Sequence, residues 1–415
     1  MRKHNHEALA QKRLDALFNA VEEDRKDLEL FVEAEHKTTQ RLAKELSRLG
    51  EIGHIFDGIP YISIRCKQGD AKRLVNWMYR NEVDYNFQKA FGDSFQLIQS
   101  IELSNTVSII PDSVVKNYYP RKQEDFWNLE AVGAYEAKKY GLGDGATIAI
   151  IDTGVDYTHN EVSKNFGGEK GHDFVLDSDD QIDYNGHGTH VAGITSGETT
   201  GIAINSRIYA LRVLDENGSG TEADVMAGIE WAVKHGCDVA NMSLGAPLAS
   251  KAFEEMCAYA ATEGLLLAAA AGNDGANIPV YPAAFDGVIA VAAINEDYEH
   301  ADFSNYYSTN DLSAPGVNIV SAFPNNRYRM FDGTSMATPH VTGSIALVLS
   351  ISRNKNLEQL LEETTEALGG SIPDDECHEL YGYGLVRIDK AAKQLYENPY
   401  AKALKIMRKV KEVAW

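Results

Sequence analysis

The sequence predicts an α/β protein in which a mostly parallel sheet, covered by helices on both faces, follows a small α+β domain. Apolar strand runs alternate with helical windows from Thr147 onward, which is typical of parallel sheets whose strands are connected by helices. Residues 26–98 show a different order, β-α-β-β-α-β. The chain has 415 residues, 44% of them hydrophobic, so each part can bury a core.

The small domain is expected to place helices on an antiparallel sheet. A charged helical extension at 1–25 precedes it, with Leu14, Leu17 and Phe18 on one face. The segments that follow alternate between strand and helix periodicity. They are Leu28–Ala34 (strand), Thr38–Leu49 (helix), Ile52–Cys66 (strand, broken at Asp57 and Gly58), Asp70–Glu82 (helix) and Val83–Phe91 (strand). This is the split βαβ arrangement, which by itself names no function.

Residues 99–121 are expected to form an irregular linker, because they contain Pro111 and Pro120. The large domain at 122–397 comes next. Its strand runs are Ile148–Ile151, Ile208–Val213, Leu265–Ala271 and Val288–Ala293, and its helical windows are Val191–Ser196, Ala223–His235 and Ala252–Glu263. A basic amphipathic tail at 398–415 ends the chain; it can lie on a membrane or a partner, but packing against its own domain is favoured.

Charge and cysteine content exclude several classes of protein. The net charge is −22, and residues 120–397 alone carry −25, which argues against a nucleic-acid partner. The four cysteines form no CxxC pair and are too few for a disulfide scaffold. We find no secretory leader and no stretch long enough for a membrane span, so we expect a cytoplasmic protein. A secreted chain trimmed of its leader would look the same.

Three segments carry residues suited to nucleophilic catalysis. Asp152 ends an apolar strand, where catalytic groups of open sheets gather, although a turn residue is the simpler interpretation. His187 starts a helix, whose N-terminus favours a neutral imidazole that can act as a base. His190, one turn further on, is interpreted as a packed core residue, because no third metal ligand supports an HxxH site. Ser335 starts a buried helix and is either a nucleophile or an N-cap.

Taken together, the three segments resemble the signatures of the subtilisin-like serine proteases, the subtilases. They read Asp152-Thr-Gly, His187-Gly-Thr-His and Gly-Thr-Ser335-Met-Ala-Thr-Pro, in the family's order. The resemblance implies that Ser335 is the nucleophile, His187 the general base and Asp152 the group that orients the imidazole. It also implies an oxyanion hole formed by the side chain of Asn273 and the backbone N–H of Ser335.

The resemblance further implies that substrate binds as an added strand between two backbone segments. These are Gly218, Ser219 and Gly220 on one side and Ser243, Leu244 and Gly245 on the other. Ala271, Gly272 and Val280 lie in the region that resembles the wall of the family's pocket for the P1 side chain. Val280 stands where broad-specificity members tend to have glycine, so we expect a shallower pocket.

The resemblance implies calcium as a cofactor, which we expect to be either bound at altered sites or optional, rather than absent. Gln123 and Glu161 match two ligands of the family's tight site, but the loop Gly193–Gly201 looks too short to supply the others. Asp311 matches a position in a weaker site. The acidic run before His187 is a further candidate, and it includes Asp177, Asp179, Asp180 and Asp183. That run could instead favour basic substrates, or it could be a solvated loop.

With this family in view, residues 26–98 resemble a propeptide that folds, caps and inhibits the catalytic domain, and the maturation cleavage is expected within 99–121. The implied function is that of an autoprocessed serine endopeptidase acting through an acyl-enzyme intermediate. The implied partners are protein substrates and the chain's own propeptide. One alternative is a catalytically silent binding protein of the same fold, and another is an esterase, which the absence of a GxSxG motif disfavours.

Overall fold

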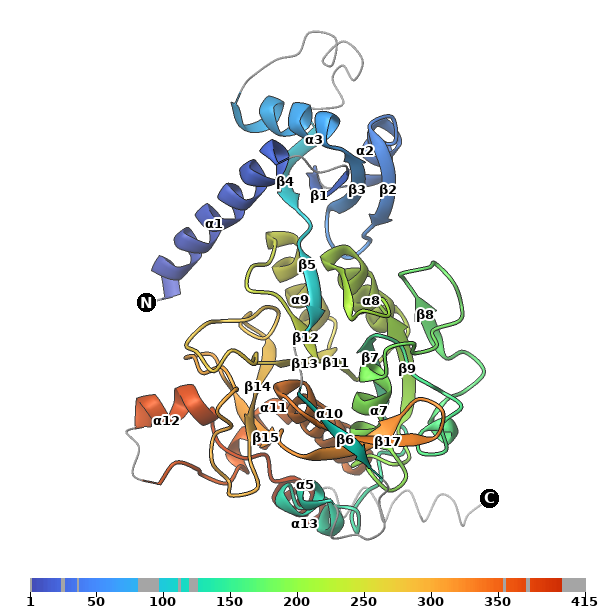
Figure 1. Ribbon diagram of the computed structural model, residues 1–415, viewed down its shortest axis with the longest axis vertical. Coiled ribbons are helices and arrows are strands. Elements are labelled where there is room, and N and C mark those ends of the chain that lie inside the picture. Colours follow the sequence, from blue (N-terminus) through green and yellow to red (C-terminus); the bar gives the residue numbers. More distant parts are fainter. Residues whose placement is uncertain are drawn as a thin grey trace.

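The computed structural model describes two stacked domains, a small N-terminal one and a large one that carries the candidate site (Figure 1). It describes all residues except 1, 24–26, 36, 81–96, 111–112, 119–125, 354–355, 371–373 and 398–415, and gives only the backbone of 2–8, 113–118 and 374–377. The C-terminal tail and Gln123 therefore lie outside the described residues. No helix among the described residues is long and apolar enough to cross a membrane.

The large domain is built on a seven-stranded parallel sheet with the order β15-β14-β13-β11-β7-β9-β8. The strands are β7 (Thr147–Asp152), β8 (Gly171–Asp173), β9 (Arg207–Arg212), β11 (Val239–Met242), β13 (Leu266–Ala270), β14 (Val288–Ile294) and β15 (Leu312–Pro315). The four predicted strand runs all lie in this sheet. Their continuous apolar character follows from burial on both faces, because helices cover each side.

Two pairs of helices cover the sheet. The pair α7 (His187–Ser196) and α10 (Thr334–Ile351) packs on one face, in a core that includes Ile148, Val191 and Ile345. The pair α8 (Glu222–Lys234) and α9 (Lys251–Thr262) packs on the other. Shorter helices complete the domain: α5 (Trp127–Ala131), α6 (Ala134–Ala137), α11 (Leu357–Glu363), α12 (Asp374–Tyr381) and α13 (Ile388–Glu397).

The N-terminal domain follows the predicted β-α-β-β-α-β order. Its elements are β1 (Asp27–Ala34), α2 (Thr39–Leu46), β2 (Gly50–Ile55), β3 (Tyr61–Lys67), α3 (Gln68–Val75) and β4 (Ile98–Leu103). The strands form an antiparallel sheet of order β2-β3-β1-β4. The last strand predicted from sequence, at 83–91, lies outside the described residues, and the fourth strand of this sheet is β4. The extension at the N-terminus forms α1 (Arg2–Glu22), which packs on α3 and β4.

The segment predicted as an irregular linker contains three strands. After β4 come β5 (Thr106–Ile109) and β6 (Ser113–Tyr118). β5 lies antiparallel between β10 (Ser219–Thr221) and β12 (Leu244–Gly245) of the large domain. β6 pairs with β17 (Arg327–Asp332), which in turn pairs with β16 (Ile319–Phe323). The prediction was wrong for β5 and β6 because the partners that order these two strands lie more than 100 residues away.

Candidate active site

Three side chains singled out in the sequence start or end major elements of the large domain. Asp152 is the last residue of β7, His187 the first of α7 and Ser335 the second of α10, and all three are buried. Because α7 and α10 pack against each other on one face of the sheet, the histidine and the serine enter the site from neighbouring helices (Figure 1). Asp152 reaches the same region from the carboxyl edge of the sheet.

Asp152 and His187 form a buried carboxylate–imidazole pair. The Nδ1 atom of His187 lies 2.7 Å from Oδ1 of Asp152, and the same oxygen accepts the backbone N–H of Thr153 at 2.7 Å. Close backbone packing holds the pair, since a Cβ added at Gly188 would lie 2.1 Å from the carbonyl oxygen of Gly154. A carboxylate in this position fixes which imidazole nitrogen carries the proton and stabilises the imidazolium form.

The carboxylate of Asp183 stabilises the start of α7 by accepting hydrogen bonds. One of its oxygens accepts the hydroxyl of Thr153 and the backbone N–H groups of Asn185 and Gly186, at 2.8–3.0 Å. The other accepts the N–H and hydroxyl of Thr189, at 2.9 and 2.6 Å. A carboxylate at a helix N-terminus satisfies N–H groups that have no partner within the helix. Asp183 was proposed as a metal ligand from sequence, but its oxygens are occupied by these five donors.

Asn273 hydrogen-bonds to Thr334, the residue that precedes Ser335 in the chain. The Oδ1 atom of Asn273 accepts the backbone N–H of Thr334 at 2.9 Å and its hydroxyl at 2.8 Å, which fixes the orientation of the amide. The hydroxyl of Ser335 donates to the carbonyl oxygen of Ser243 at 3.4 Å, and the hydroxyl of Ser243 donates to the carbonyl of Ser335 at 2.8 Å. The serine therefore sits at the N-terminus of α10, beside one of the two predicted substrate-binding segments.

A strand of the chain itself fills the cleft predicted for substrate. Ser219 and Gly220 belong to β10, Leu244 and Gly245 form β12, and Gly218 and Ser243 precede these strands. β5 runs antiparallel between them, and the backbone N–H of Ile109 donates to the carbonyl of Gly218 at 2.8 Å. These two segments therefore accept an extended peptide backbone, as strand addition requires.

The next residue, Ile110, occupies a small apolar pocket. It forms a buried cluster with Ala270 and Val280, close to Ala271 and Gly272 of the predicted pocket wall. A Cβ added at Gly245 would lie 2.4 Å from a methyl group of Val280, so the valine fills the space beside β12. Ile110 thus contacts the wall proposed for the P1 side chain.

The N-terminal domain docks on α8 through both polar and apolar contacts. The carboxylate of Glu230 accepts the N–H groups of Asp57 and Gly58 at 2.6 and 2.9 Å, and Lys234 pairs with Asp57 at 2.7 Å. Phe31 and Phe56 of the small domain join the core that covers α8 and α9. These contacts hold the small domain over the cleft side of the large one.

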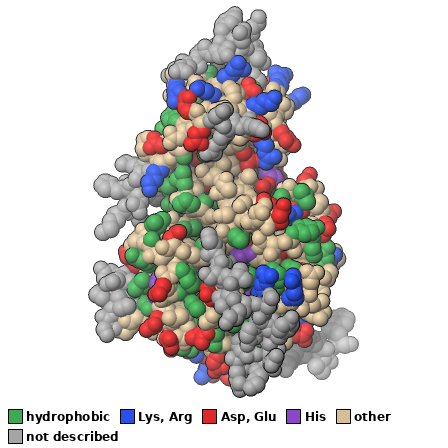
Figure 2. Space-filling view, viewed as in Figure 1, with side chains coloured by type: hydrophobic (Ala, Val, Ile, Leu, Met, Phe, Trp, Pro, Cys, Tyr) green, Lys and Arg blue, Asp and Glu red, His purple; other side chains and the backbone are tan. Residues whose placement is uncertain are grey.

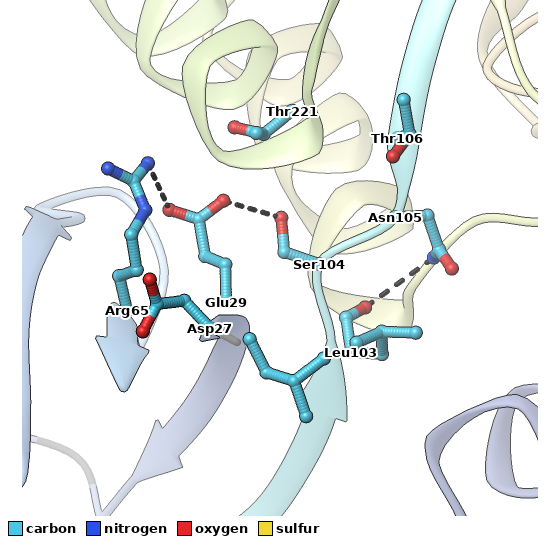
Figure 3. A pocket seen from close by; sticks show the side chains of 9 residues that line it. Asp27, Glu29, Arg65, Leu103, Ser104, Asn105, Thr106 and Thr221 are labelled. Carbon is cyan, nitrogen blue, oxygen red and sulfur yellow. Dashed lines mark hydrogen bonds and ion pairs between the residues drawn. The ribbon is translucent and has the colours of Figure 1, made fainter. Parts of the chain in front are cut away.

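A polar cavity of about 210 Å³ lies where the chain passes from β4 to β5 (Figure 3). Glu29 points into it, 3.6 Å from Arg65 and accepting the hydroxyl of Ser104 at 3.0 Å. Burial, with Asp224 nearby, raises the pKa of Glu29. The cavity lies at the interface of the two domains, and Thr221 lines it on the side of the large domain.

The residues proposed as calcium ligands do not converge in the structure. Glu161 accepts the N–H and hydroxyl of Thr199, the N–H of Thr200 and the hydroxyl of Tyr328. Asp311 accepts the N–H of Ala290 at 2.8 Å, and burial raises the pKa of Asp311 to about 7. Among the described residues, no three His, Cys, Asp or Glu side chains are placed to hold a metal ion. The described carboxylates therefore do not enclose a calcium ion by themselves.

The rest of the acidic run behaves as a solvated loop. The side chains of Asp177 and Asp179 are 97% and 100% exposed beside His172, and Asp180 accepts the hydroxyl of Tyr157 at 2.9 Å. Because these carboxylates are directed at different partners, they do not enclose a cation.

His190 takes the position expected of a core residue. It stacks on Phe331, with ring centroids 4.4 Å apart, and its Nε2 lies 3.0 Å from the carbonyl oxygen of Arg329. Burial lowers the pKa of His190 to about 3, so the ring stays neutral. A neutral, stacked imidazole is consistent with a packing role.

The large domain is thus a parallel α/β fold with a buried aspartate–histidine pair at the carboxyl edge of its sheet and a buried serine at the start of the neighbouring helix α10. The model of the subtilase family matches residues 143–384. The chain therefore belongs to the subtilase family, the subtilisin-like serine proteases.

Individual relatives agree with this assignment. The chain is 34% identical over 381 residues to a thermostable alkaline protease of Halalkalibacterium halodurans, covering 90% of this chain and 93% of the relative. It is 44% identical over 234 residues to a thermophilic serine proteinase of Bacillus sp. strain AK1; the match covers 55% of this chain and only 58% of that relative.

One solved structure is similar over most of the chain. Fervidolysin from Fervidobacterium pennivorans, a keratinolytic enzyme related to subtilisin, matches with a TM-score of 0.72 and 26% identity. The match covers 89% of this chain and 62% of fervidolysin, so it includes the N-terminal domain as well as the large one.

Proposed function

We propose that the chain is a serine endopeptidase that uses Ser335, His187 and Asp152 as its catalytic residues. The observation that carries the proposal is the peptide strand β5, which is hydrogen-bonded between β10 and β12. Ser243, the residue before β12, hydrogen-bonds with Ser335. A cleft that holds a peptide backbone beside a buried serine and a carboxylate-supported imidazole suits peptide hydrolysis.

In the proposed mechanism, Oγ of Ser335 attacks the scissile carbonyl carbon while His187 accepts the hydroxyl proton. Asp152 stabilises the imidazolium that results. The negative charge on the carbonyl oxygen is bound by the amide N–H of Asn273 and the backbone N–H of Ser335, at the positive end of α10. When the C–N bond breaks, His187 returns the proton to the leaving amine. Water then repeats the sequence on the acyl-enzyme and releases the acid.

The N-terminal domain is proposed to act as an inhibitory propeptide. Its sheet docks on α8, and the chain leaving that sheet continues as β5 into the cleft, so substrate and β5 compete for the same backbone groups. Release then requires cleavage within 99–121 and departure of the small domain. A silent binding protein would hold peptide in the same way without cutting it, and only turnover separates the two functions.

The test compares wild type with Ser335→Ala on casein and on a gel. We expect wild type to shorten itself and to cleave casein in a manner blocked by a serine-directed reagent, and Ser335→Ala to lose at least about 10⁴-fold in rate. Ser163→Ala, at an exposed serine, is the matched control and should behave as wild type. A wild-type chain that stays at full length and cuts nothing would overturn the proposal.

A further inference from the structure

The first helix, α1, is anchored at its C-terminal half in the core of the small domain. Leu17, Ala20 and Val21 are buried there. Phe18 packs edge-on against Tyr79, with ring centroids 6.1 Å apart. These contacts fix the direction of the helix relative to the sheet, so its other half projects as a stiff arm.

The N-terminal half of α1 reaches the large domain. The Nε atom of Arg13 donates to the carbonyl oxygen of Ala249 at 2.6 Å, and a terminal nitrogen of the same guanidinium lies 2.9 Å from the carboxylate of Glu254. The side chain of Arg13 is only 13% exposed. Ala249 lies two residues before the start of α9, and Glu254 lies in its first turn. In Figure 1, α1 slants from the small domain toward the left edge of the large one.

On the N-terminal side of Arg13, α1 lies beside the chain segment that carries Val280. Leu9 and Lys12 line a cavity of about 330 Å³ together with Pro279 and Tyr281 of the large domain. Those two residues flank Val280, which contacts Ile110. The backbone of Tyr281 also pairs with Ala246, next to β12. The arm therefore abuts the chain segments that hold β5 in place.

We propose that Leu9, Lys12 and Arg13 of α1, here named the α1 latch, form a second autoinhibitory contact that keeps β5 seated in the cleft. The inference rests on the proposed function, in which a seated β5 blocks the site. Only Ser104 and Asn105 separate β4 from β5, so β5 cannot leave far without the small domain lifting. When the small domain lifts, its contact with α8 and the α1 latch must break together. Because α1 is a stiff helix that contacts both domains, it opposes this movement.

The test measures hydrogen exchange of the backbone amides of residues 106–109 in the full chain carrying Ser335→Ala, which cannot cut itself. We expect Arg13→Ala to speed this exchange about tenfold, because two charge-assisted hydrogen bonds are lost. Glu254→Gln, which alters only the large domain, should speed it in the same direction. Arg48→Ala is the matched control, since Arg48 pairs with Glu45 inside the small domain, and it should leave the exchange unchanged.

A charge-reversed pair, Arg13→Glu with Glu254→Arg, should exchange more slowly than Arg13→Glu alone, because the ion pair forms again although the carbonyl oxygen of Ala249 loses its donor. Exchange in β1–β4 reports whether the small domain stays folded. If Arg13→Ala unfolds the small domain, the exchange rates of Glu254→Gln and of the reversed pair decide whether the latch exists. Unchanged exchange at 106–109 in Glu254→Gln would overturn the latch, as would failure of the reversed pair. None of these measurements needs turnover, so an inactive wild type would overturn the proposed function, whereas the exchange rates alone decide whether the α1 latch keeps β5 seated.

Discussion

At the scale of single residues, Asp183 and Glu161 show that a buried carboxylate can hold loops together by accepting hydrogen bonds. Both carboxylates are buried, and both are surrounded by N–H and hydroxyl donors from nearby loops. Glu161 was predicted as a metal ligand from the family resemblance, and Asp183 from the acidic run, whose oxygens suit calcium. The sequence could not show where the oxygens point, since donors such as Thr189 and Tyr328 carry no signal of their partners. The motif residues Asp152, His187 and Ser335 were predictable because their short flanking sequences are specific.

The shape of the P1 pocket can be tested at Val280. In Val280→Gly, loss of the side chain that Ile110 contacts should open the pocket to aromatic residues. We expect kcat/KM for peptides with Phe at P1, relative to Val at P1, to rise by about tenfold or more. The measurement is a set of matched chromogenic peptides assayed with matured enzyme. Ile278→Ala, at an exposed neighbour, is the control, and an unchanged ratio in Val280→Gly would contradict the assignment of the pocket.

At the scale of elements, β5 is the part that sequence reasoning missed. The central sheet was predictable, since its strands are apolar runs that helices cover on both sides, and so was the order of the small domain. β5 has only four residues, and its two neighbours come from distant loops, so no local periodicity marks it. Strands of this kind are set by tertiary pairing rather than by propensity.

The junction of β5 with α8 predicts a pH dependence. Glu222, at the start of α8, accepts the side-chain amide of Asn105 at 2.9 Å and the N–H of Ser250 at 3.1 Å, and burial raises the pKa of Glu222 to about 7. A carboxyl whose pKa is raised by folding stabilises the folded state while protonated. That contribution is complete below pH 4.5 and is lost as pH rises through about 7.

The experiment is urea unfolding of the Ser335→Ala chain between pH 5 and 8. Its free energy of unfolding should fall across this range by up to about 3 kcal/mol from this group, and Glu222→Gln should flatten that fall. Glu263→Gln, at an exposed site on the end of α9, should keep the wild-type slope. Equal slopes for Glu222→Gln and wild type would show that Glu222 does not titrate there.

At the scale of the whole molecule, two domains of unlike charge share one cleft. The formal net charge of residues 1–119 is −1 and that of 120–397 is −25. On the face in Figure 2, Lys and Arg side chains gather on the upper, small domain, while Asp and Glu are spread over the large one. The negative charge therefore belongs mainly to the domain that would remain after maturation.

Thermal stability of the whole chain tests the calcium prediction. Because Glu161 is satisfied by protein donors, a chelator should change the unfolding midpoint of the Ser335→Ala chain by less than about 2 °C. Glu161→Ala should lower the free energy of unfolding by about 2–3 kcal/mol, since it leaves buried donors without their acceptor. Glu198→Ala, at an exposed position nearby, is the control. A large drop with chelator would instead show that the chain binds a stabilising calcium ion.

The chain continues from β5 to β6 and the large domain, and this covalent link sets the effective concentration of the inhibitory strand in the cleft. While the chain is intact, β5 competes with substrate as if present at millimolar concentration or above, so even a weak strand saturates the cleft. One cut after β5 turns the same contact into an ordinary bimolecular complex, whose occupancy falls on dilution. Activation would then depend on protein concentration, proceeding readily in dilute solution and slowly where the chains are crowded together.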